Sequence, residues 1–378
     1  MDKTATNMNL PEEEPGGHAA ALEIKPQTKT YKNFFQNIHD LSKVISFSPQ
    51  EKKKLENVAE TYHLRVPFYY FSLIKNRYDS KDPIRAQCIP SPEEFEVSGE
   101  ESMDPLAEEQ MSPVSCLVHR YPDRALLIVT SQCFMYCRHC TRKRLWREKA
   151  LESNLQDIDK AISYIKKNKQ IREVIVSGGD PLTLDTSKID YILSEISRLK
   201  HIEAIRIGTR APVVFPQRIN EALCRMLRKY NKLWINVQFN HHWEVTPQSA
   251  QACMRLARCG IPISNQSVLL RGINDSPEVM IELCHKLQSI RVRPYYLFQC
   301  DPVVGASHFR TPVRKGIEII EKMRGFTSGM CIPTFVVDGI EGKGKVPLGP
   351  NYLVSENEGC VALRNYRGEV FRYHAPKE

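Results

Sequence analysis

Residues 125–140 read Ala-Leu-Leu-Ile-Val-Thr-Ser-Gln-Cys-Phe-Met-Tyr-Cys-Arg-His-Cys, and this stretch decides the fold. Its first half is a continuous apolar run that is short enough for a buried β-strand. Three cysteines, Cys133, Cys137 and Cys140, follow directly. A buried strand that leads into reactive side chains is typical of α/β proteins, whose chemistry lies on the loops after the strands.

The same alternation continues along the chain. After residues 125–130 we predict strands at residues 173–176, 202–207, 233–239, 261–270 and 293–299, with helices near residues 158–165, 189–196 and 219–227, after Thr246-Pro247, after Ser276-Pro277, and at residues 313–324. Each Thr/Ser-Pro pair supplies an N-cap and a first-turn proline. Apolar strands alternating six times with helices imply a parallel sheet covered by helices.

We therefore predict an α/β fold, a partial (β/α)6 TIM-like barrel, with a doubly wound sheet as the alternative. One more strand, at residues 332–337, lies outside the rhythm. Residues 1–29 are rich in Glu, Pro, Gly and Thr and are expected to be a disordered tail. Residues 30–115 are predicted to form a helical N-terminal extension, 116–330 the barrel core, and 331–378 a C-terminal closing segment.

Composition excludes some classes of protein and limits others. The 378 residues contain no apolar run of the roughly 18 residues that a membrane helix needs, so no membrane partner is expected. Twelve cysteines without a secretory signal favour a reducing compartment, and we predict a cytoplasmic protein. The net charge of +9 is interpreted as a solvated basic surface, because no stretch combines dense Lys and Arg with aromatics. Nucleic acid is therefore not the expected partner.

Polar or glycine-rich residues follow most of the predicted strands. They are Ser177-Gly178-Gly179-Asp180 after the second strand, Asn240-His241-His242 after the fourth, Cys300-Asp301 after the sixth, and Asp338 after the extra strand. In a parallel barrel these strand ends share one face, so we expect the residues to surround one site.

The cysteines have the spacing C-x3-C-x2-C, which core packing does not require. Clustered thiolates suit a soft metal. Structural zinc takes four closed ligands, and no fourth ligand lies at finger-like spacing nearby. A [4Fe–4S] cluster held by three cysteines instead leaves one iron open to an outside ligand. The motif therefore indicates an iron–sulfur cluster that takes part in a reaction.

The motif, with the glycine-rich loop after the second strand, resembles the radical S-adenosylmethionine superfamily. The finer pattern resembles the lysine 2,3-aminomutase family, which couples the adenosyl radical to pyridoxal phosphate (PLP). The matching stretches are His119-Arg-Tyr-Pro-Asp-Arg124, Met135-Tyr-Cys-Arg-His-Cys-Thr-Arg142, Ser177-Gly-Gly-Asp180, Asn265-Gln-Ser-Val-Leu-Leu-Arg271, Arg293-Pro-Tyr-Tyr296, Gln299-Cys-Asp301, His308-Phe-Arg-Thr-Pro312, Pro333-Thr-Phe-Val-Val-Asp338 and Lys345-Val-Pro347. The resemblance covers about residues 115–370 and implies a small amino-acid substrate.

The resemblance also implies roles for individual residues. The cluster ligands would be Cys133, Cys137 and Cys140, and the S-adenosylmethionine contacts Ser177, Gly178, Gly179, Asp180, His139 and Gln266. The PLP contacts would be Lys345 and Arg120, and the substrate contacts Arg142, Asp301 and Asp338. Without the resemblance, the residue types do not separate Lys345 from Lys343.

Several positions depart from the family pattern. The family's lysine enzymes often carry a C-terminal cysteine cluster that binds zinc together with a neighbouring subunit, and this sequence has neither that cluster nor its partner cysteine, where Ser276 stands. We therefore do not expect zinc, and a homo-oligomer remains open. Gln238 stands where a histidine is expected, and Phe298 replaces a tyrosine.

The expected function is the interconversion of L-lysine and L-β-lysine by 2,3-amino migration, with electrons from a reductase or from a flavodoxin or ferredoxin. In the family, Asp301 and Asp338 match two aspartates that bind the ε-ammonium and that members acting on glutamate lack. Three alternatives remain open: an aminomutase for arginine, ornithine or a protein-linked pathway, a radical enzyme modifying RNA, and a non-catalytic electron-transfer or zinc protein.

Overall fold

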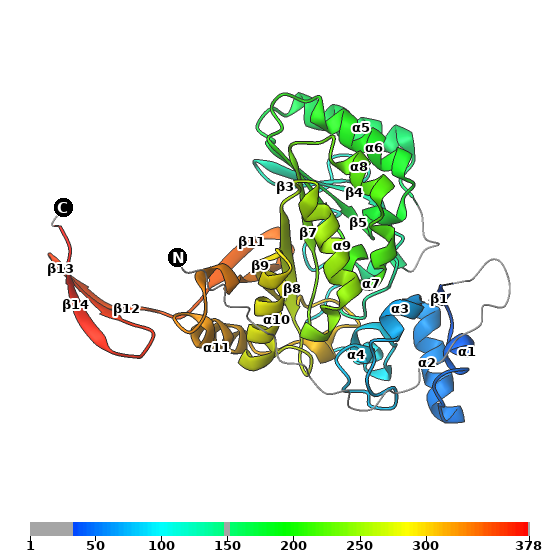
Figure 1. The fold of residues 1–378 in the computed structure, drawn as a ribbon, viewed down its shortest axis with the longest axis horizontal. Coiled ribbons are helices and arrows are strands. Elements are labelled where there is room, and N and C mark those ends of the chain that lie inside the picture. Colours follow the sequence, from blue (N-terminus) through cyan, green and yellow to red (C-terminus); the bar gives the residue numbers. More distant parts are fainter. Residues whose placement is uncertain (1–32, 147–151, 377–378) are drawn as a thin grey trace, which may run out of the picture. The chain divides into compact units, whose positions relative to one another are not determined.

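Parallel strands form the centre of the protein (Figure 1). In this computed structural model, which describes residues 33–146 and 152–376, a nine-stranded sheet has the order β11-β10-β9-β8-β7-β6-β5-β4-β3. Strands β4 to β10 pair in parallel, and β3 and β11 add antiparallel ends. The bounds are β3 Leu117–Tyr121, β4 Arg124–Thr130, β5 Glu173–Gly178, β6 Ala204–Gly208, β7 Leu233–Val237, β8 Ile263–Leu269, β9 Arg293–Gln299, β10 Thr334–Gly339 and β11 Gly344–Leu348.

The order of the strands distinguishes the two predicted architectures. A doubly wound sheet reverses its strand order at a switch point, whereas here spatial order follows chain order throughout. The α/β partial barrel is therefore confirmed, and the doubly wound alternative is wrong. The extra strand predicted at residues 332–337 is β10, which continues the parallel series beside β9 instead of lying outside it.

Helices between successive strands cover the outside of the sheet (Figure 1). They are α5 Leu155–Lys167, α6 Thr186–Ser197, α7 Ala211–Val214, α8 Glu221–Leu227, α9 Pro247–Arg258, α10 Pro277–Ser289 and α11 Val313–Met323. The predicted helix starts are confirmed, because Thr246 accepts from the Ser249 amide at 3.2 Å and Ser276 from the Val279 amide at 3.3 Å. Ser276 is therefore the N-cap of α10.

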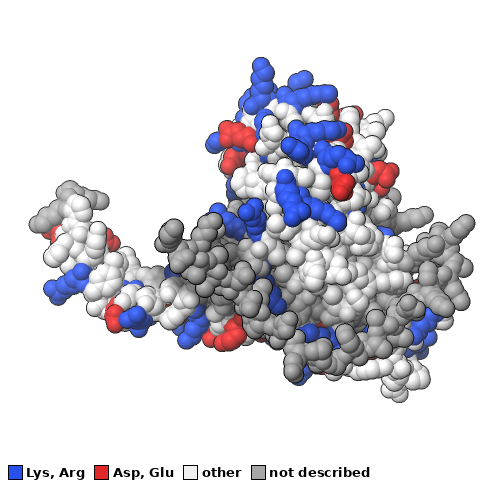
Figure 2. Space-filling model, viewed as in Figure 1, with Lys and Arg blue, Asp and Glu red and all other residues white. Residues whose placement is uncertain are grey.

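The outer helices carry a mixture of charges. On the face in Figure 2, basic side chains gather over the helices between β4 and β7, with acidic side chains among them. Lys160 pairs with Asp157 at 3.4 Å and Lys229 with Asp190 at 3.0 Å. This supports interpreting the net positive charge as a solvated surface.

The N-terminal part is less helical than the sequence suggested. It contains β1 Phe34–Phe35, α1 Ile38–Leu41, α2 Pro49–Thr61, β2 Val66–Pro67, α3 Phe68–Phe71, α4 Arg85–Cys88 and a 3₁₀ turn η1 Pro92–Phe95. Only α2 exceeds a single turn. The predicted tail, residues 1–29, lies outside the described residues. The described residues from Phe34 onward cluster as one compact unit.

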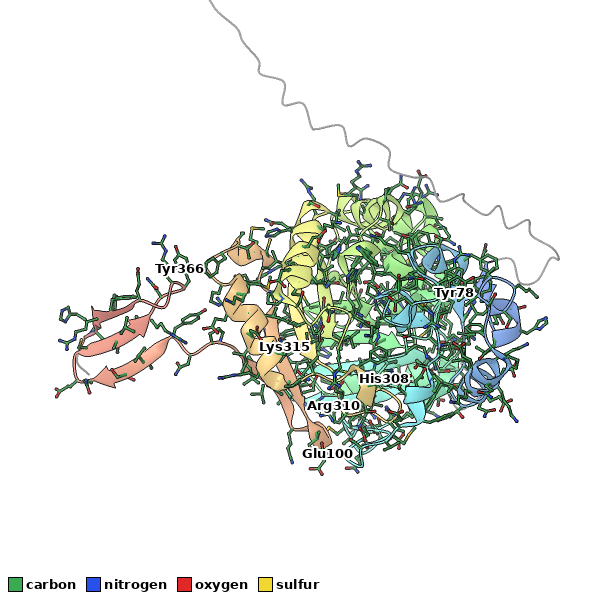
Figure 3. All side chains as sticks on the ribbon, turned by 90° about the horizontal axis from the view of Figure 1, so that it is seen from below. Tyr78, Glu100, His308, Arg310, Lys315 and Tyr366 are labelled. Carbon is green, nitrogen blue, oxygen red and sulfur yellow. The ribbon has the colours of Figure 1, made fainter. Side chains whose placement is uncertain are left out.

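A separate three-stranded antiparallel sheet follows β11. Its strands are β12 Leu353–Asn357, β13 Cys360–Arg364 and β14 Val370–His374, and their side chains stand out on both faces (Figure 3). The ring of Tyr366 packs edge-on against Phe326 with centroids 5.3 Å apart. Among the described helices, none is long and apolar enough to cross a membrane.

The two end strands of the main sheet approach each other through side chains. The Tyr121 hydroxyl on β3 accepts a hydrogen bond from the backbone amide of Lys345 on β11 at 3.0 Å. Arg120, the preceding residue on β3, forms an ion pair with Asp338 on β10 at 3.1 Å. These contacts bring the ends of an otherwise open barrel together beside its lumen.

Close packing of α11 on β10 gives a test of the fold. A Cβ added at Gly316 on α11 would overlap the ring of Phe335, which is buried on β10. We expect Gly316→Ala to lower the free energy of unfolding by about 1–3 kcal/mol, since overpacking outweighs the gain in helix propensity. Thermal and urea unfolding would measure it. Gly329→Ala, where nothing lies within 4 Å, is the control and should be close to neutral.

Candidate active site

One cavity of about 450 Å³ gathers every residue to which the resemblance assigns a role. Its lining includes Cys133, Cys137, Cys140, His139, Arg142, Ser177, Gly178, Gly179, Asp180, Gln266, Asp301, Asp338, Arg120 and Lys345. These residues come from the ends of β4, β5, β9 and β10, from the middle of β8, and from β3 and β11. The expectation that the strand ends share one site holds for these residues, but Asn240, His241, His242 and Cys300, which were expected there too, do not line the cavity.

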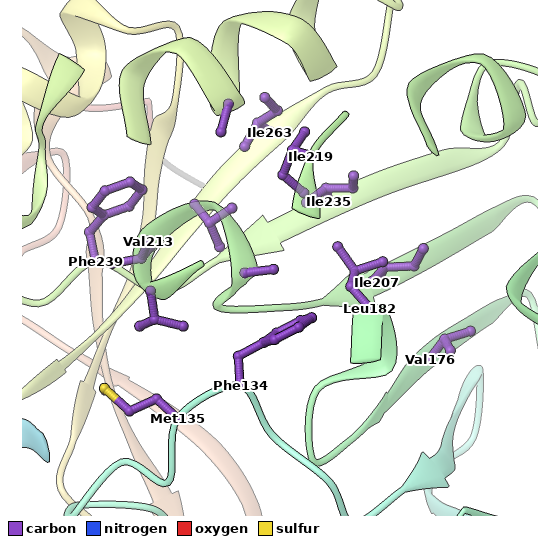
Figure 4. Packing of buried hydrophobic residues seen from close by; sticks show 14 of the residues in the cluster. Phe134, Met135, Val176, Leu182, Ile207, Val213, Ile219, Ile235, Phe239 and Ile263 are labelled. Atoms are coloured by element: carbon purple, nitrogen blue, oxygen red, sulfur yellow. The ribbon is translucent and has the colours of Figure 1, made fainter. Parts of the chain in front are cut away.

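The cysteine loop is anchored by its apolar residues. Phe134 and Met135 point into the barrel core, where they are 8% and 2% exposed (Figure 4). Between these anchors and Cys140, the buried guanidinium of Arg138 pairs with Glu94 of η1 at 2.6 Å. Within the motif, residues that anchor the loop, namely Phe134, Met135 and Arg138, therefore lie between the cysteines, which line the cavity.

The three thiols are free and line the cavity. Burial raises the pKa of Cys140 to about 11 and holds that of Cys133 well above its usual range. A bound metal would therefore have to displace their protons. Among the described residues, no group of three Cys, His, Asp or Glu is arranged as it would be around a single ion.

The glycine-rich loop is packed against the start of the cysteine loop. The amide of Gly179 donates to the Thr130 carbonyl at 2.6 Å, and that of Asp180 to the Gln132 carbonyl at 2.7 Å. Gly178 has a φ of +128°, and a Cβ there would overlap the Thr130 carbonyl. The glycines are thus required for contact between the two loops.

The Asp180 side chain organises the strand ends. Its carboxylate accepts hydrogen bonds from the Thr209 hydroxyl at 2.7 Å, the Arg210 amide at 2.9 Å and the Leu182 amide at 3.0 Å. Burial raises its pKa. It therefore ties the loop after β5 to the loop after β6.

His139 lines the cavity, and one of its ring nitrogens accepts hydrogen bonds from the protein. Its Nε2 lies 3.2 Å from the amide nitrogens of both Gln238 and Asn240, so it accepts and the proton resides on Nδ1. Burial, with the charges of Arg210 and Lys143, holds the pKa of His139 well below 6.5. The buried Nδ1 has no partner among the described residues, which leaves a donor for a bound group.

The structure separates Lys345 from Lys343. Lys345 pairs across the β10–β11 ladder with Asp338, and its Nζ lies 3.1 Å from the Asp338 carboxylate. Lys343 points outward, 67% exposed, and pairs with Glu341. Phe298, the residue that replaces a tyrosine, has its ring 5.3 Å from the Lys345 Nζ. Only Lys345 offers its amine to the cavity.

A second carboxyl group lies near this ammonium. Asp301 accepts a hydrogen bond from the Thr141 hydroxyl at 2.7 Å. Burial, reinforced by the Asp338 carboxylate, raises its pKa to about 6, although Thr141 and the Lys345 and Arg120 charges oppose this. The two aspartates thus form an acidic end of the cavity.

Arg142 has a protein partner that the sequence did not reveal. Its Nε and Nη2 bind the Glu108 carboxylate at 2.9 and 2.6 Å, and Arg144 adds a bond at 2.8 Å. Burial alone would raise the pKa of Glu108, but these arginines hold it at about 2. The Nη1 of Arg142 takes no part in this pair, so part of the fork is left for a ligand.

Sequence reasoning missed Arg210, Thr141 and Glu108, and two strand arginines, Arg124 and Arg206, that also line the cavity. Arg210 was detectable, because it follows β6 at the same edge as the other strand-end residues. The strand arginines gave no signal, since strand interiors were assumed to serve packing. Glu108 lies in an acidic segment that resembles a solvated loop.

The cavity wall suits the groups that the resemblance implies. Three thiols on one loop match a [4Fe–4S] cluster with an open iron. The unpartnered Nδ1 of His139 and the neighbouring glycine loop suit S-adenosylmethionine. A half-buried amine at Lys345 with arginines Arg120 and Arg124 suits an aldehyde cofactor that bears a phosphate.

Comparisons with known proteins agree with this site. A family model for the radical SAM superfamily matches residues 127–284, and one for lysine-2,3-aminomutase matches residues 320–378. An L-lysine 2,3-aminomutase from Fusobacterium nucleatum is 49% identical, across 92% of this chain and 81% of its own. One from Clostridium subterminale is 47% identical, with 91% and 83% covered. A glutamate 2,3-aminomutase from Clostridioides difficile is 43% identical, with 90% and 80% covered.

A barrel with three thiols after its first parallel strand and a glycine loop after the next defines a radical S-adenosylmethionine enzyme. The sequence identity of nearly one half to L-lysine 2,3-aminomutases, over most of both chains, identifies the family within this superfamily. The chain belongs to the lysine 2,3-aminomutase family. It is therefore an isomerase that works with a [4Fe–4S] cluster, S-adenosylmethionine and PLP. The predicted family, enzyme class and cofactors are confirmed.

The raised pKa of Asp301 predicts a pH effect on stability. The pKa rises on folding from 3.8 to about 6, so this contribution is fully present below pH 3.8 and is lost as pH rises through about 6. Relative to Asp301→Asn, the wild-type protein should lose about 2 kcal/mol between pH 4 and pH 7. Melting temperatures across this range would show it. Thr141→Val should move the transition to higher pH, and a difference that does not vary with pH would contradict the prediction.

Proposed function

We propose that this protein interconverts L-lysine and L-β-lysine by moving the amino group between C2 and C3. The observation that carries the proposal is the contact between the Lys345 ammonium and Asp338, beside Asp301. The contact with the chain's own lysine ammonium supports a role of this acidic end in binding the ε-ammonium of a lysine substrate. When Lys345 is bound to PLP, the aspartates are left for the substrate ε-ammonium.

The other end of the substrate is assigned to Arg142. A guanidinium fork recognises a carboxylate, and Glu108 already shows that Arg142 binds one here. Glu108 also fixes the direction of the guanidinium, which leaves Nη1 for the substrate α-carboxylate. A molecule with a carboxylate at one end and a cation at the other would span the cavity from Arg142 to the aspartates.

The remaining residues are assigned to the cofactors. Cys133, Cys137 and Cys140 would hold the cluster, and the loop from Ser177 to Asp180 with His139 and Gln266 would surround S-adenosylmethionine. Lys345 would hold PLP through its amine, with Arg120 near the phosphate. When bound, the cluster with S-adenosylmethionine supplies reversible hydrogen abstraction, and PLP supplies a π system over which an amino group can migrate. The protein orients the substrate and keeps the cavity closed to water.

Identity alone does not select the substrate, because a relative named glutamate 2,3-aminomutase is almost as similar as those named for lysine. The charge of the acidic end supports one class of substrate over the other. A glutamate side chain would place a carboxylate against Asp301 and Asp338, which repel it, whereas an ammonium is attracted. This favours a cationic substrate, with arginine and ornithine as the alternatives to lysine.

The proposal also covers the partners. Reduction of the cluster needs a one-electron donor, and we expect a reductase or a flavodoxin or ferredoxin. A buried cluster and free thiols suit a reducing compartment, in keeping with a cytoplasmic location. The lack of zinc and the oligomeric state remain predictions.

The choice of PLP lysine can be tested by trapping. Borohydride reduction of the PLP-loaded protein should fix the cofactor to Lys345, and Lys345→Ala should abolish the adduct while iron content stays unchanged. Lys343→Ala is the matched control and should keep the adduct, since its side chain points away from the cavity. An adduct that survives in Lys345→Ala would show that another lysine holds PLP.

Anaerobic turnover tests the reaction itself. Protein supplied with PLP, S-adenosylmethionine and a strong reductant should form β-lysine from L-lysine only when all three are present. Asp338→Asn should lower kcat/KM for lysine by about a hundredfold, because about 3 kcal/mol is lost when one member of a buried charge pair is removed. Cleavage of S-adenosylmethionine without β-lysine would reject lysine and direct the search to arginine and ornithine.

A further inference from the structure

Arg210 makes a direct contact with one of the cysteines of the motif. It follows β6, and its guanidinium is buried, with the side chain 7% exposed. Its Nη1 donates to the Sγ of Cys137 at 2.8 Å. No role described so far requires a cation at this position, and among the charged side chains of residues 33–146 and 152–376 it is the one that donates to a motif sulfur.

The guanidinium is fixed from several directions. Its Nη2 donates to the Gln87 side chain and to Glu244, each at 2.6 Å, and lies 3.3 Å from the Tyr70 hydroxyl. Its Nε donates to the Gln238 carbonyl at 3.1 Å. Tyr70 and Gln87 lie on α3 and α4 of the N-terminal extension. The extension therefore fixes the position of the group that contacts Cys137.

Glu244 is a fully bonded partner for this cation. Its carboxylate accepts from the Tyr70 hydroxyl at 2.6 Å and from the backbone amides of Asn240 and His241 at 2.5 and 2.9 Å. The ion pair with Glu244 uses only the Nη2 of Arg210. The Nη1 of the same guanidinium donates instead to the Cys137 sulfur. A rigid fork with one arm on a carboxylate and the other on a thiol suits a group that positions the thiol.

We propose that Arg210 is a positioning residue for the iron–sulfur cluster, one that orients Cys137 and stabilises the reduced state through its charge and its N–H···S bond. The inference rests on the assignment of Cys137 as a cluster ligand. One electron from an external donor, such as a reduced flavoprotein or dithionite, enters the cluster and adds one negative charge. A cation beside a ligand sulfur favours that state, and hydrogen bonds to sulfur act in the same direction.

The test is the midpoint potential of the cluster, followed by electron paramagnetic resonance in anaerobic protein without S-adenosylmethionine. Arg210→Gln should lower the ratio of reduced to oxidised cluster at a given potential at least tenfold. This corresponds to a midpoint potential that is more negative by about 59 mV for one electron. Arg210→Lys, which keeps the charge, should recover part of the shift. Glu244→Gln removes a negative charge and should shift the potential in the positive direction.

The potentials of Arg210→Gln and Glu244→Gln are expected to shift with opposite signs. A general loosening of the fold would instead shift both potentials in the same direction. Equal potentials in wild type, Arg210→Gln and Glu244→Gln would overturn the proposal, as would shifts of the same sign. If Arg210→Gln fails to retain iron, Arg210→Lys and Glu244→Gln decide the matter by the same criteria. Arg255→Gln, whose guanidinium binds the Ile219 carbonyl, is the matched control with no expected shift.

Failure of the underlying assignment would be recognised separately. Cys137→Ala should lose iron, and if it retains a normal cluster, the ligand assignment is wrong whatever Arg210 does. The potential does not depend on which amino acid is the substrate. A positive result for Arg210 therefore stands even if lysine is not turned over.

Discussion

Parallel pairing of β4 to β10 is the constraint on which the rest of the structure depends. Because the strands run in one direction and in chain order, each loop that follows a strand opens at the same edge. Thiols, glycines, arginines and carboxylates that are far apart in sequence therefore meet in one cavity. Backbone bonds from Gly179 and Asp180 to Thr130 and Gln132 then hold the first two loops together, so the cysteines depend on the β4–β5 pairing directly.

The antiparallel ends of the sheet complete the cavity in a different way. Strand β11 places Lys345 directly opposite Asp338, and β3 places Arg120 on the same carboxylate. One aspartate thus links both ends of the sheet across the open side of the barrel. An ion pair can be broken and formed again, which would suit the proposed role of Lys345 in holding a cofactor and releasing it. A closed run of backbone hydrogen bonds would not permit this.

The sequence predicted the regular part of the fold because buried parallel strands and amphipathic helices have strong periodicity. It missed β3, β11 and the C-terminal sheet, whose strands have only five residues each. Strand β11 contains a glycine and a proline, and the strands of the C-terminal sheet are not deeply buried, so none of them shows a buried apolar run. The thiols were predictable from local spacing. Glu108 was not, because its importance arises from a contact with Arg142, 34 positions away, that no local pattern encodes.

The N-terminal extension supplies partners for the buried cations around the cysteine loop. Arg138 and Lys143 both pair with Glu94, and Arg210 bonds Gln87 and Tyr70. Burial, opposed by Glu94, lowers the pKa of Lys143 to about 8, which shows how strongly the site penalises charge.

Without these partners, each cation would be left buried and unpaired, at a cost of several kcal/mol. The cations have an electrostatic role of their own, because three thiolates that hold a cluster would bring negative charge into the same small volume. The extension is therefore part of the electrostatic structure of the site, since it allows positive charge to be kept beside the cysteines. This explains why a segment with little regular secondary structure is nevertheless packed into the same compact unit as the barrel.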